Sequence, residues 1–128
     1  MKTFITTTAL LLFSLVQIQA QTTSCENKIE TFAFVEDSTV FLTWKLNREV
    51  NTDYFVIERA VNGAGFQTIA TEDAKGYTVH ASSYDFEDAE FSTEAGYRVV
   101  LVTMDGQRIA SQTLHLSQSS AVANAPAR

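Results

Sequence analysis

Apolar and polar residues alternate with a period of two along most of this chain, and this alternation constrains the fold more than any other feature of the sequence. Between residues 40 and 46 every second side chain is apolar, and Trp44 is one of these. Lys45 belongs to the alternate positions. Successive side chains of a β-strand point to opposite faces of a sheet, so the pattern predicts a strand with one buried face. No segment after residue 20 keeps a helical period for three turns. The sequence therefore predicts an all-β domain.

Seven segments carry strand-like patterns, and short turn-forming stretches separate them. The glycine-bearing stretch 61–65 predicts a hairpin, and Asp105 with Gly106 predicts another, because such residues accommodate the positive φ angles of tight turns. Seven short strands at these intervals are typical of a β-sandwich that spans residues 29–117. The expected strands are 29–35, whose in/out phase is ambiguous, and 40–46, 54–60, 66–70, 84–86, 97–103 and 108–117.

The first 20 residues have the order of a secretory signal peptide. Lys2 supplies a positive start, residues 9–16 form an apolar run with one serine, and Ala20 offers the small residue that signal peptidase requires. The run is far shorter than the ~20 residues that cross a bilayer, so we expect cleavage and no stable membrane insertion. A buried N-terminal helix is the alternative, but nothing amphipathic marks one.

Two polar segments flank the expected sandwich. Residues 21–28 form an N-terminal linker that contains the only cysteine, Cys25, which therefore makes no internal disulfide. We expect a free thiol, with an intermolecular disulfide as the alternative. Lipid attachment at Cys25 is disfavoured, because residues 22–24 lack the aliphatic residue that such a site carries at its start. Residues 118–128 are small and mostly polar, which predicts a flexible C-terminal tail.

The charge balance excludes several classes of partner. The chain has nine basic and fifteen acidic residues, a formal net charge of −6 at pH 7. It contains no basic cluster that could follow a phosphate backbone, so we expect no nucleic-acid binding. The same balance disfavours adsorption to an anionic membrane. An acidic surface does keep an exported domain soluble.

Several motifs resemble one family of sandwich domains in their order and spacing. Val40-x-Leu42-x-Trp44 resembles the second strand of a fibronectin type III domain, where the tryptophan fills the core. Phe91, six residues before Tyr97, resembles the segment that enters the sixth strand. Residues 49–60 are similar to a segment common in exported proteins of the Bacteroidetes. The same order continues through Gly65-Phe66-Gln67-Thr68-Ile69, Tyr84-Asp85-Phe86-Glu87-Asp88, Tyr97-Arg98 and Asp105-Gly106.

This resemblance implies a fold and a general role. It covers residues 29–117 and implies a seven-stranded fibronectin type III/immunoglobulin-like β-sandwich that acts as a structural or binding module, with no common ligand. Larger relatives often carry a C-terminal sorting domain for type IX secretion, and the residues after 117 are too few for such a domain. We therefore expect a protein that crosses the inner membrane and is periplasmic or extracellular.

The residues that could carry catalysis are few. His80 lies near Ser82, Ser83 and Asp85, but no nucleophile elbow accompanies them, so we expect a solvated loop histidine. His115 lies between two leucines and is expected to point outward from the last strand. The sequence therefore predicts no catalytic residue.

The densest acidic run consists of Asp85, Glu87, Asp88 and Glu90. Its carboxylates could serve Ca²⁺, but the run lacks the regular spacing and central glycine of an EF-hand. We expect Asp88 to cap a turn instead. One cysteine and two separated histidines cannot build a closed zinc site. We therefore expect neither a metal ion nor a cofactor.

Strand phase separates an expected core from a candidate partner patch. On two neighbouring strands the side chains that face away from the core would form an apolar row, which could bind a partner or a second copy. The alternative is that β-branched residues simply suit an exposed strand. Glu58 and Arg98 are expected to form a cross-strand ion pair. The candidate patch is Tyr54, Val56, Val100 and Val102, and the expected core contains Trp44, Phe55, Ile57, Phe66, Tyr97, Val99 and Leu101.

The sequence thus predicts a non-catalytic, exported interaction or adhesion module. Its partner would be a protein or a glycan of the cell envelope or outside the cell. The alternative is a small periplasmic enzyme or inhibitor that uses the loop region between His80 and Asp88.

Overall fold

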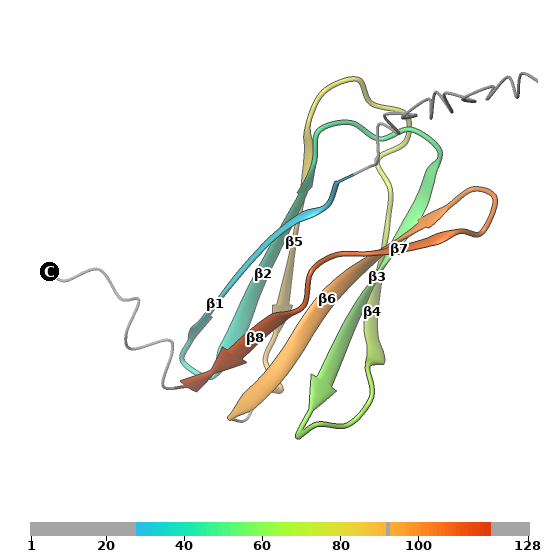
Figure 1. Cartoon of the computed structure of the whole chain (residues 1–128). Helices are drawn as coiled ribbons and strands as arrows, with labels where there is room; N and C mark the ends of the chain where they lie inside the picture. Colours follow the sequence, from blue (N-terminus) through green and yellow to red (C-terminus); the bar gives the residue numbers. More distant parts are fainter. Residues whose placement is uncertain (1–27, 92, 119–128) are drawn as a thin grey trace, which may run out of the picture.

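The computed structural model describes residues 28–91 and 93–118, and its elements are strands (Figure 1). The expected signal peptide 1–20, the linker 21–28 except its last residue, and the tail beyond Gln118 lie outside the described residues, as does Cys25. Within the described part of the chain, no helix is long and apolar enough to cross a membrane. The strands are β1 (Glu30–Glu36), β2 (Thr39–Leu46), β3 (Thr52–Val61), β4 (Gln67–Asp73), β5 (Ser82–Asp88), β6 (Glu94–Thr103), β7 (Arg108–Ala110) and β8 (Leu114–Ser117).

The strands form two antiparallel sheets that face each other across a shared core (Figure 1). The smaller sheet has the order β1-β2-β5, and the larger sheet has the order β4-β3-β6-β7, with β8 also paired to β6. The two sheets bury the faces that they turn toward each other, which is what a period of two in the sequence demands. The prediction of an all-β chain built from two antiparallel sheets is confirmed.

The last expected strand is divided in two. Val100 pairs with Ala110 on β7, whereas Tyr97 pairs with Leu114 on β8. The stretch from Ala110 to Leu114 is four residues long in step, whereas the stretch of β6 that it faces, from Val100 to Tyr97, is three. The extra residue interrupts the ladder of backbone hydrogen bonds. Ser111 bridges the interruption, because its backbone N–H donates to the Val99 carbonyl at 2.8 Å. The described residues thus contain eight strands where the sequence predicted seven.

Aromatic side chains from both sheets form the centre of the core. Trp44 of β2 stacks on Tyr84 of β5 with ring centroids 5.3 Å apart, and Phe55 of β3 meets Trp44 edge-on at 5.7 Å. Such pairs contribute roughly 0.5–1.5 kcal/mol beyond the burial of their area. Phe66, which we expected in the core, is only half-buried. The other six expected core residues are buried: Trp44, Phe55, Ile57, Tyr97, Val99 and Leu101.

The two turns that the sequence predicted differ in their backbone. Asn62 and Gly63, in the loop between β3 and β4, have φ angles of 52° and 71°, and the Ala64 backbone N–H donates to the Val61 carbonyl at 3.0 Å, so the two residues are the centre of a β-turn with positive φ at both positions. After β6 only Gly106 has a positive φ, 85°, so the expectation that Asp105 would share this conformation is wrong. Asp105 instead accepts a hydrogen bond from Thr103 Oγ1 at 2.5 Å and holds the turn through its side chain.

Candidate functional site

The candidate partner patch is a covered layer on the outer face of the larger sheet. Val56, Val100 and Val102 do point away from the core, but they are only 4%, 3% and 6% exposed. They pack against one another and against the half-buried Tyr54. The expectation that these four residues form an exposed apolar row is therefore wrong.

Two arginines and one glutamate explain why the valines are covered. Arg98 Nε lies 2.6 Å from Glu58 Oε2, which is the expected cross-strand pair, and Arg108 Nη2 lies 3.1 Å from Glu58 Oε1. In the register of the sheet Arg108 pairs with Val102, whereas Glu58 pairs with Arg98. The Arg108 side chain therefore crosses the intervening row, which contains Val100. Its aliphatic stem covers the valines while its charged end binds Glu58.

Phe66 belongs to the same outer layer. The Arg98 guanidinium carbon lies 4.0 Å from the centre of the Phe66 ring, a cation–π contact. Because Glu58 holds Arg98 in place, the ring is fixed on the outside of the sheet. The Phe66 ring therefore packs against Arg98 on the outer face of the sheet, away from the core.

Asp88 caps a turn and also joins the two sheets. Its Oδ1 accepts the Glu90 backbone N–H at 3.0 Å, and its Oδ2 accepts hydrogen bonds from Tyr97 OH at 2.6 Å and Arg59 Nη1 at 2.7 Å. Burial raises the pKa of Asp88, but the hydrogen bonds from Tyr97 and Arg59 outweigh burial and hold the pKa below its ordinary value. Burial and the Asp88 carboxylate raise the pKa of Tyr97. The group therefore stabilises the contact between the sheets.

The residues between His80 and Asp88 do not converge on a site. Asp85 lies on the exposed face of β5 and accepts a hydrogen bond from Thr43 Oγ1 at 2.7 Å, whereas Asp88 is buried on the opposite face. His80 is exposed in the loop before β5, where its carbonyl accepts Thr78 Oγ1 at 2.9 Å. In residues 28–91 and 93–118, no group of three or more His, Cys, Asp or Glu side chains could hold a metal ion.

A buried carboxylate that the sequence did not single out lies beside the aromatic core. Glu49 is fully buried, and its Oε1 accepts hydrogen bonds from Ser82 Oγ and Tyr84 OH. Its backbone also pairs with Thr78, which ties the segment before β3 to the loop before β5. Burial, together with the hydrogen bond to Glu49, raises the pKa of Tyr84 to about 12. Glu49 lies between strands, where no periodic pattern marks a buried position.

A cluster of exposed aromatic rings lies on the smaller sheet instead. Phe32 and Phe34 of β1 are 58% and 57% exposed, and Phe34 stacks on Phe41 of β2 with ring centroids 5.1 Å apart. We call Phe32, Phe34 and Phe41 the aromatic face. Among the described strands β1 pairs only with β2, so it forms one edge of its sheet. Clustered exposed aromatic rings on a small domain typically mark an interaction site.

Carboxylates border the aromatic face on the same side of the sheet. Glu87 of β5 pairs with Phe41 of β2 in the register, and Asp85 lies two residues from Glu87 on the same side of β5. The two ends of β1 add one carboxylate each. The four exposed acidic side chains are Glu30, Glu36, Asp85 and Glu87, and the one basic residue of β1, β2 and β5 is Lys45.

The aromatic face could not be predicted from the sequence, because β1 is apolar in both phases. Ala33 and Val35 could face the core as well as Phe32 and Phe34 could. In the structure the smaller pair packs inward, and Val35 contacts the cluster around Tyr97. The acidic residues at both ends of β1 were the available signal, because they share the phase of the phenylalanines.

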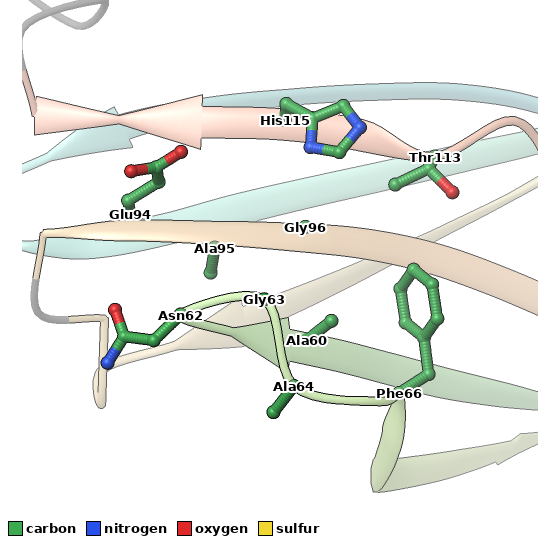
Figure 2. A pocket seen from close by; sticks show the side chains of 10 residues that line it. All are labelled: Ala60, Asn62, Gly63, Ala64, Phe66, Glu94, Ala95, Gly96, Thr113 and His115. Carbon is green, nitrogen blue, oxygen red and sulfur yellow. The ribbon is translucent and has the colours of Figure 1, made fainter.

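A hollow of about 450 Å³ opens on the outer face of the larger sheet (Figure 2). Ala60 of β3 and Gly96 of β6 pair in the register and form its floor. The β3–β4 turn borders one side and β8 the other, and Phe66 closes one end (Figure 2). The exposed His115, which does point outward from its strand, is part of the rim. The polar side chains around the hollow are those of Asn62, Glu94, Thr113 and His115.

Comparisons with known proteins identify the fold and no family. No family model and no curated protein sequence matches the chain. Similar solved structures include the pectate lyase PelI from Erwinia chrysanthemi in complex with tetragalacturonic acid, with a TM-score of 0.57 and 17% identity over 72% of this chain and 29% of that chain. Pectate lyase Pel3 from Pectobacterium carotovorum has a TM-score of 0.57 and 17% identity over 80% of this chain and 28% of that chain. This chain spans less than a third of either protein, and a likeness at this identity shows the fold alone.

Proposed function

We propose that this chain is a non-catalytic, exported interaction module of the fibronectin type III kind, and that its aromatic face binds a protein partner. The observation that carries the proposal is the exposure of Phe32 and Phe34 beside Phe41. Covering these rings would remove apolar area from water, at about 25 cal/mol per Å². Buried aromatic anchors of this kind supply much of the binding energy of protein interfaces.

The strand order supports the fibronectin type III assignment. In constant-type immunoglobulin domains the fourth strand joins the sheet of the first, second and fifth strands. Here β4 pairs with β3 in the other sheet. Two motifs that carry the resemblance also agree with it. Trp44 of the second strand is fully buried, and Phe91 packs in one cluster with Tyr97.

The border of the aromatic face indicates the chemistry of the partner. Four carboxylates and one lysine surround the rings, so a basic partner gains favourable electrostatic interactions and an acidic one does not. A second copy would bring carboxylates against carboxylates, which argues against self-association through this face. The outer edge of β1 pairs with no described strand, although β8 packs beside it, and it offers backbone groups to an extended segment. We therefore propose a partner segment that alternates basic and apolar side chains.

Two synthetic peptides test this proposal. One alternates valine with arginine and the other alternates valine with glutamate, and each is titrated into the isotope-labelled full chain while backbone amide signals are followed. We expect the arginine peptide to shift the signals of β1 and β2, with an affinity that falls as salt rises. We expect no shift with the glutamate peptide.

Matched variants distinguish the aromatic face from any exposed apolar residue. The paired substitution Phe32→Ser with Phe34→Ser should weaken binding of the arginine peptide by at least about tenfold. Val79→Ser is the control, because Val79 is 65% exposed in the loop before β5 and lies outside the face. Unchanged binding in the paired variant, or equal binding of the two peptides, would overturn the proposal.

Export has its own test. The pattern of residues 1–20 supports cleavage after Ala20, so the chain recovered from producing cells should begin at Gln21. Intact mass measurement of the protein from separated cell fractions checks both the cleavage and the location. A chain that retains residues 1–20 in the cytoplasmic fraction would contradict export.

A further inference from the structure

We propose that the hollow on the larger sheet binds one ring of a neutral saccharide. This inference goes beyond the proposed protein contact and concerns the opposite outer face of the sandwich. The aromatic face lies on the outside of the smaller sheet, whereas the hollow lies over β3, β6 and β8 of the larger one (Figure 2). The two sites can therefore be tested independently.

The hollow exists because residue 96 has no side chain. Gly96 lies between Ala60 and His115 in the register of the sheet. A Cβ atom at Gly96 would lie 3.3 Å from Thr113 Cγ2 and 3.7 Å from His115 Nδ1. Its φ angle lies outside the positive region, so the backbone does not require glycine there. The small residue instead leaves space on a surface that longer side chains cover elsewhere.

An aromatic ring closes one end of this space and is held in place. The Arg98 guanidinium packs on the Phe66 ring, and Glu58 holds Arg98 by a hydrogen bond of 2.6 Å. A fixed ring requires little ordering when a ligand binds. Its apolar surface and the Ala60 methyl group suit the C–H face of a sugar. The volume of about 450 Å³ lies in the range typical of small-ligand sites.

Four polar side chains surround the apolar floor. Within residues 28–91 and 93–118, no hydrogen bond or ion pair occupies the side chains of Asn62, Glu94, Thr113 and His115. Together they present an amide, a carboxylate, a hydroxyl and an imidazole, and so both donate and accept. A ligand rich in hydroxyl groups satisfies such a mixed set, because each hydroxyl also donates and accepts.

Charge disfavours an anionic ligand. The Glu94 carboxylate on the rim repels an anionic sugar, and the chain carries a net charge of −6. Hence a neutral sugar ring fits the hollow better than a uronic acid.

Titration of the labelled full chain with defined sugars tests the inference. The probes are cellobiose, xylobiose and mannobiose at up to ~10 mM, a range that detects weak binding, with tetragalacturonic acid as the anionic comparison. At least one neutral probe should shift the amide signals of Gly96, His115 and Asn62. Tetragalacturonic acid should leave them unchanged.

Variants of the rim connect these shifts to the hollow. Glu94→Gln and His115→Ala should each weaken binding by about threefold to tenfold while leaving the melting temperature unchanged, because both side chains are exposed. Gly96→Val should abolish the shifts by filling the space. The paired Phe32→Ser, Phe34→Ser variant should bind the sugar normally. It thereby separates a failure of this inference from a failure of the protein-binding proposal.

Three results would overturn the inference. They are the absence of any shift around Gly96 with every neutral probe, equal binding of tetragalacturonic acid, and full sugar binding by both Glu94→Gln and His115→Ala. If Gly96→Val fails to fold, these two exposed variants still decide the question.

Discussion

Arg59 of β3 and Asp88 of β5 join the two sheets of the sandwich by an ion pair with 2.7 Å between Nη1 and Oδ2. The two strands belong to different sheets, so no backbone ladder connects them. Tyr97 of β6 donates its hydroxyl to the same oxygen. One buried carboxylate thus receives donors from two strands of the facing sheet, and its loss should weaken the whole sandwich.

Asp88→Asn should lower the free energy of unfolding at neutral pH by about 2 kcal/mol. Breaking a buried ion pair costs about 3–5 kcal/mol, and the 18% exposure of Arg59 reduces that figure through solvent screening. Urea denaturation measures the change. Asp85→Asn is the control, because its exposed carboxylate bonds only to Thr43 among the described residues, and it should cost less than about 0.5 kcal/mol. Equal losses in the two variants would contradict an inter-sheet role for Asp88.

Acid should remove the difference between the wild type and Asp88→Asn. The folded pKa of Asp88 lies below 3.8, because the hydrogen bonds from Tyr97 and Arg59 outweigh the effect of burial. A depressed folded pKa contributes stability that is present above the unfolded pKa and is lost as pH falls through the folded pKa. The gap in unfolding free energy should therefore hold down to about pH 5 and shrink below about pH 4. A gap that stays constant in stronger acid would contradict this origin.

Tyr84→Phe should change the alkaline titration of the protein. Burial and the hydrogen bond to Glu49 raise the pKa of Tyr84 to about 12. A raised folded pKa contributes stability below the unfolded value of about 10, and this stability is lost as pH rises through the folded value. The phenolate absorbance step near pH 12 should diminish in the variant. Tyr77→Phe, at a position 76% exposed, should leave that step in place.

Val100→Lys should destabilise the monomer rather than alter its association. Val100 is 3% exposed beneath the Arg108 side chain, and a lysine there would place an ammonium group near two guanidinium groups. We expect a loss of about 2–4 kcal/mol in the free energy of unfolding. Val79→Lys is the exposed control and should change it by less than about 0.5 kcal/mol. A Val100→Lys protein of normal stability that loses self-association would restore the valine row as a partner surface.

Gly63→Ala and Gly65→Ala should differ although neither new methyl group meets an atom within 4 Å. Gly63 has a φ of 71° and Gly65 lies outside the positive region, so only the first substitution strains the backbone. Thermal unfolding should show a loss of about 1–2 kcal/mol for Gly63→Ala. Gly65→Ala should be neutral or slightly stabilising. Equal effects would mean that the turn relaxes to another type.

Features that arise from residues close together in the sequence could be predicted, whereas features that arise from contacts between distant segments could not. The alternation that contains Trp44 and the glycine-bearing turn at Gly63 act over a few residues, and both indicate an all-β chain from local sequence alone. The Glu58–Arg98 pair followed from aligning two strong neighbouring strands. The division of the last strand into β7 and β8 could not be predicted, because it arises from one extra residue opposite β6 in the pairing of the two segments.

The candidate site was less predictable, since it depends on what lies beside each strand. The valine row around Val100 points outward as the phase implied, yet the long side chain of Arg108 covers it. Phe66 is a large aromatic residue like those of the core, but its ring packs against Arg98 on the outer face of the larger sheet. Neither event leaves a periodic mark in the sequence.

By itself, the sequence determined that the chain alternates into strands and that it folds as two antiparallel sheets, because period-two patterning and turn chemistry are local properties. Only the tertiary structure decided that Phe32 and Phe34 face solvent while Ala33 and Val35 face the core. Both phases of β1 are apolar, so the choice rests on which side chains fit the space between the sheets beside Tyr97. The same long-range packing leaves Gly96 at the floor of a hollow and brings Asp88 to Arg59.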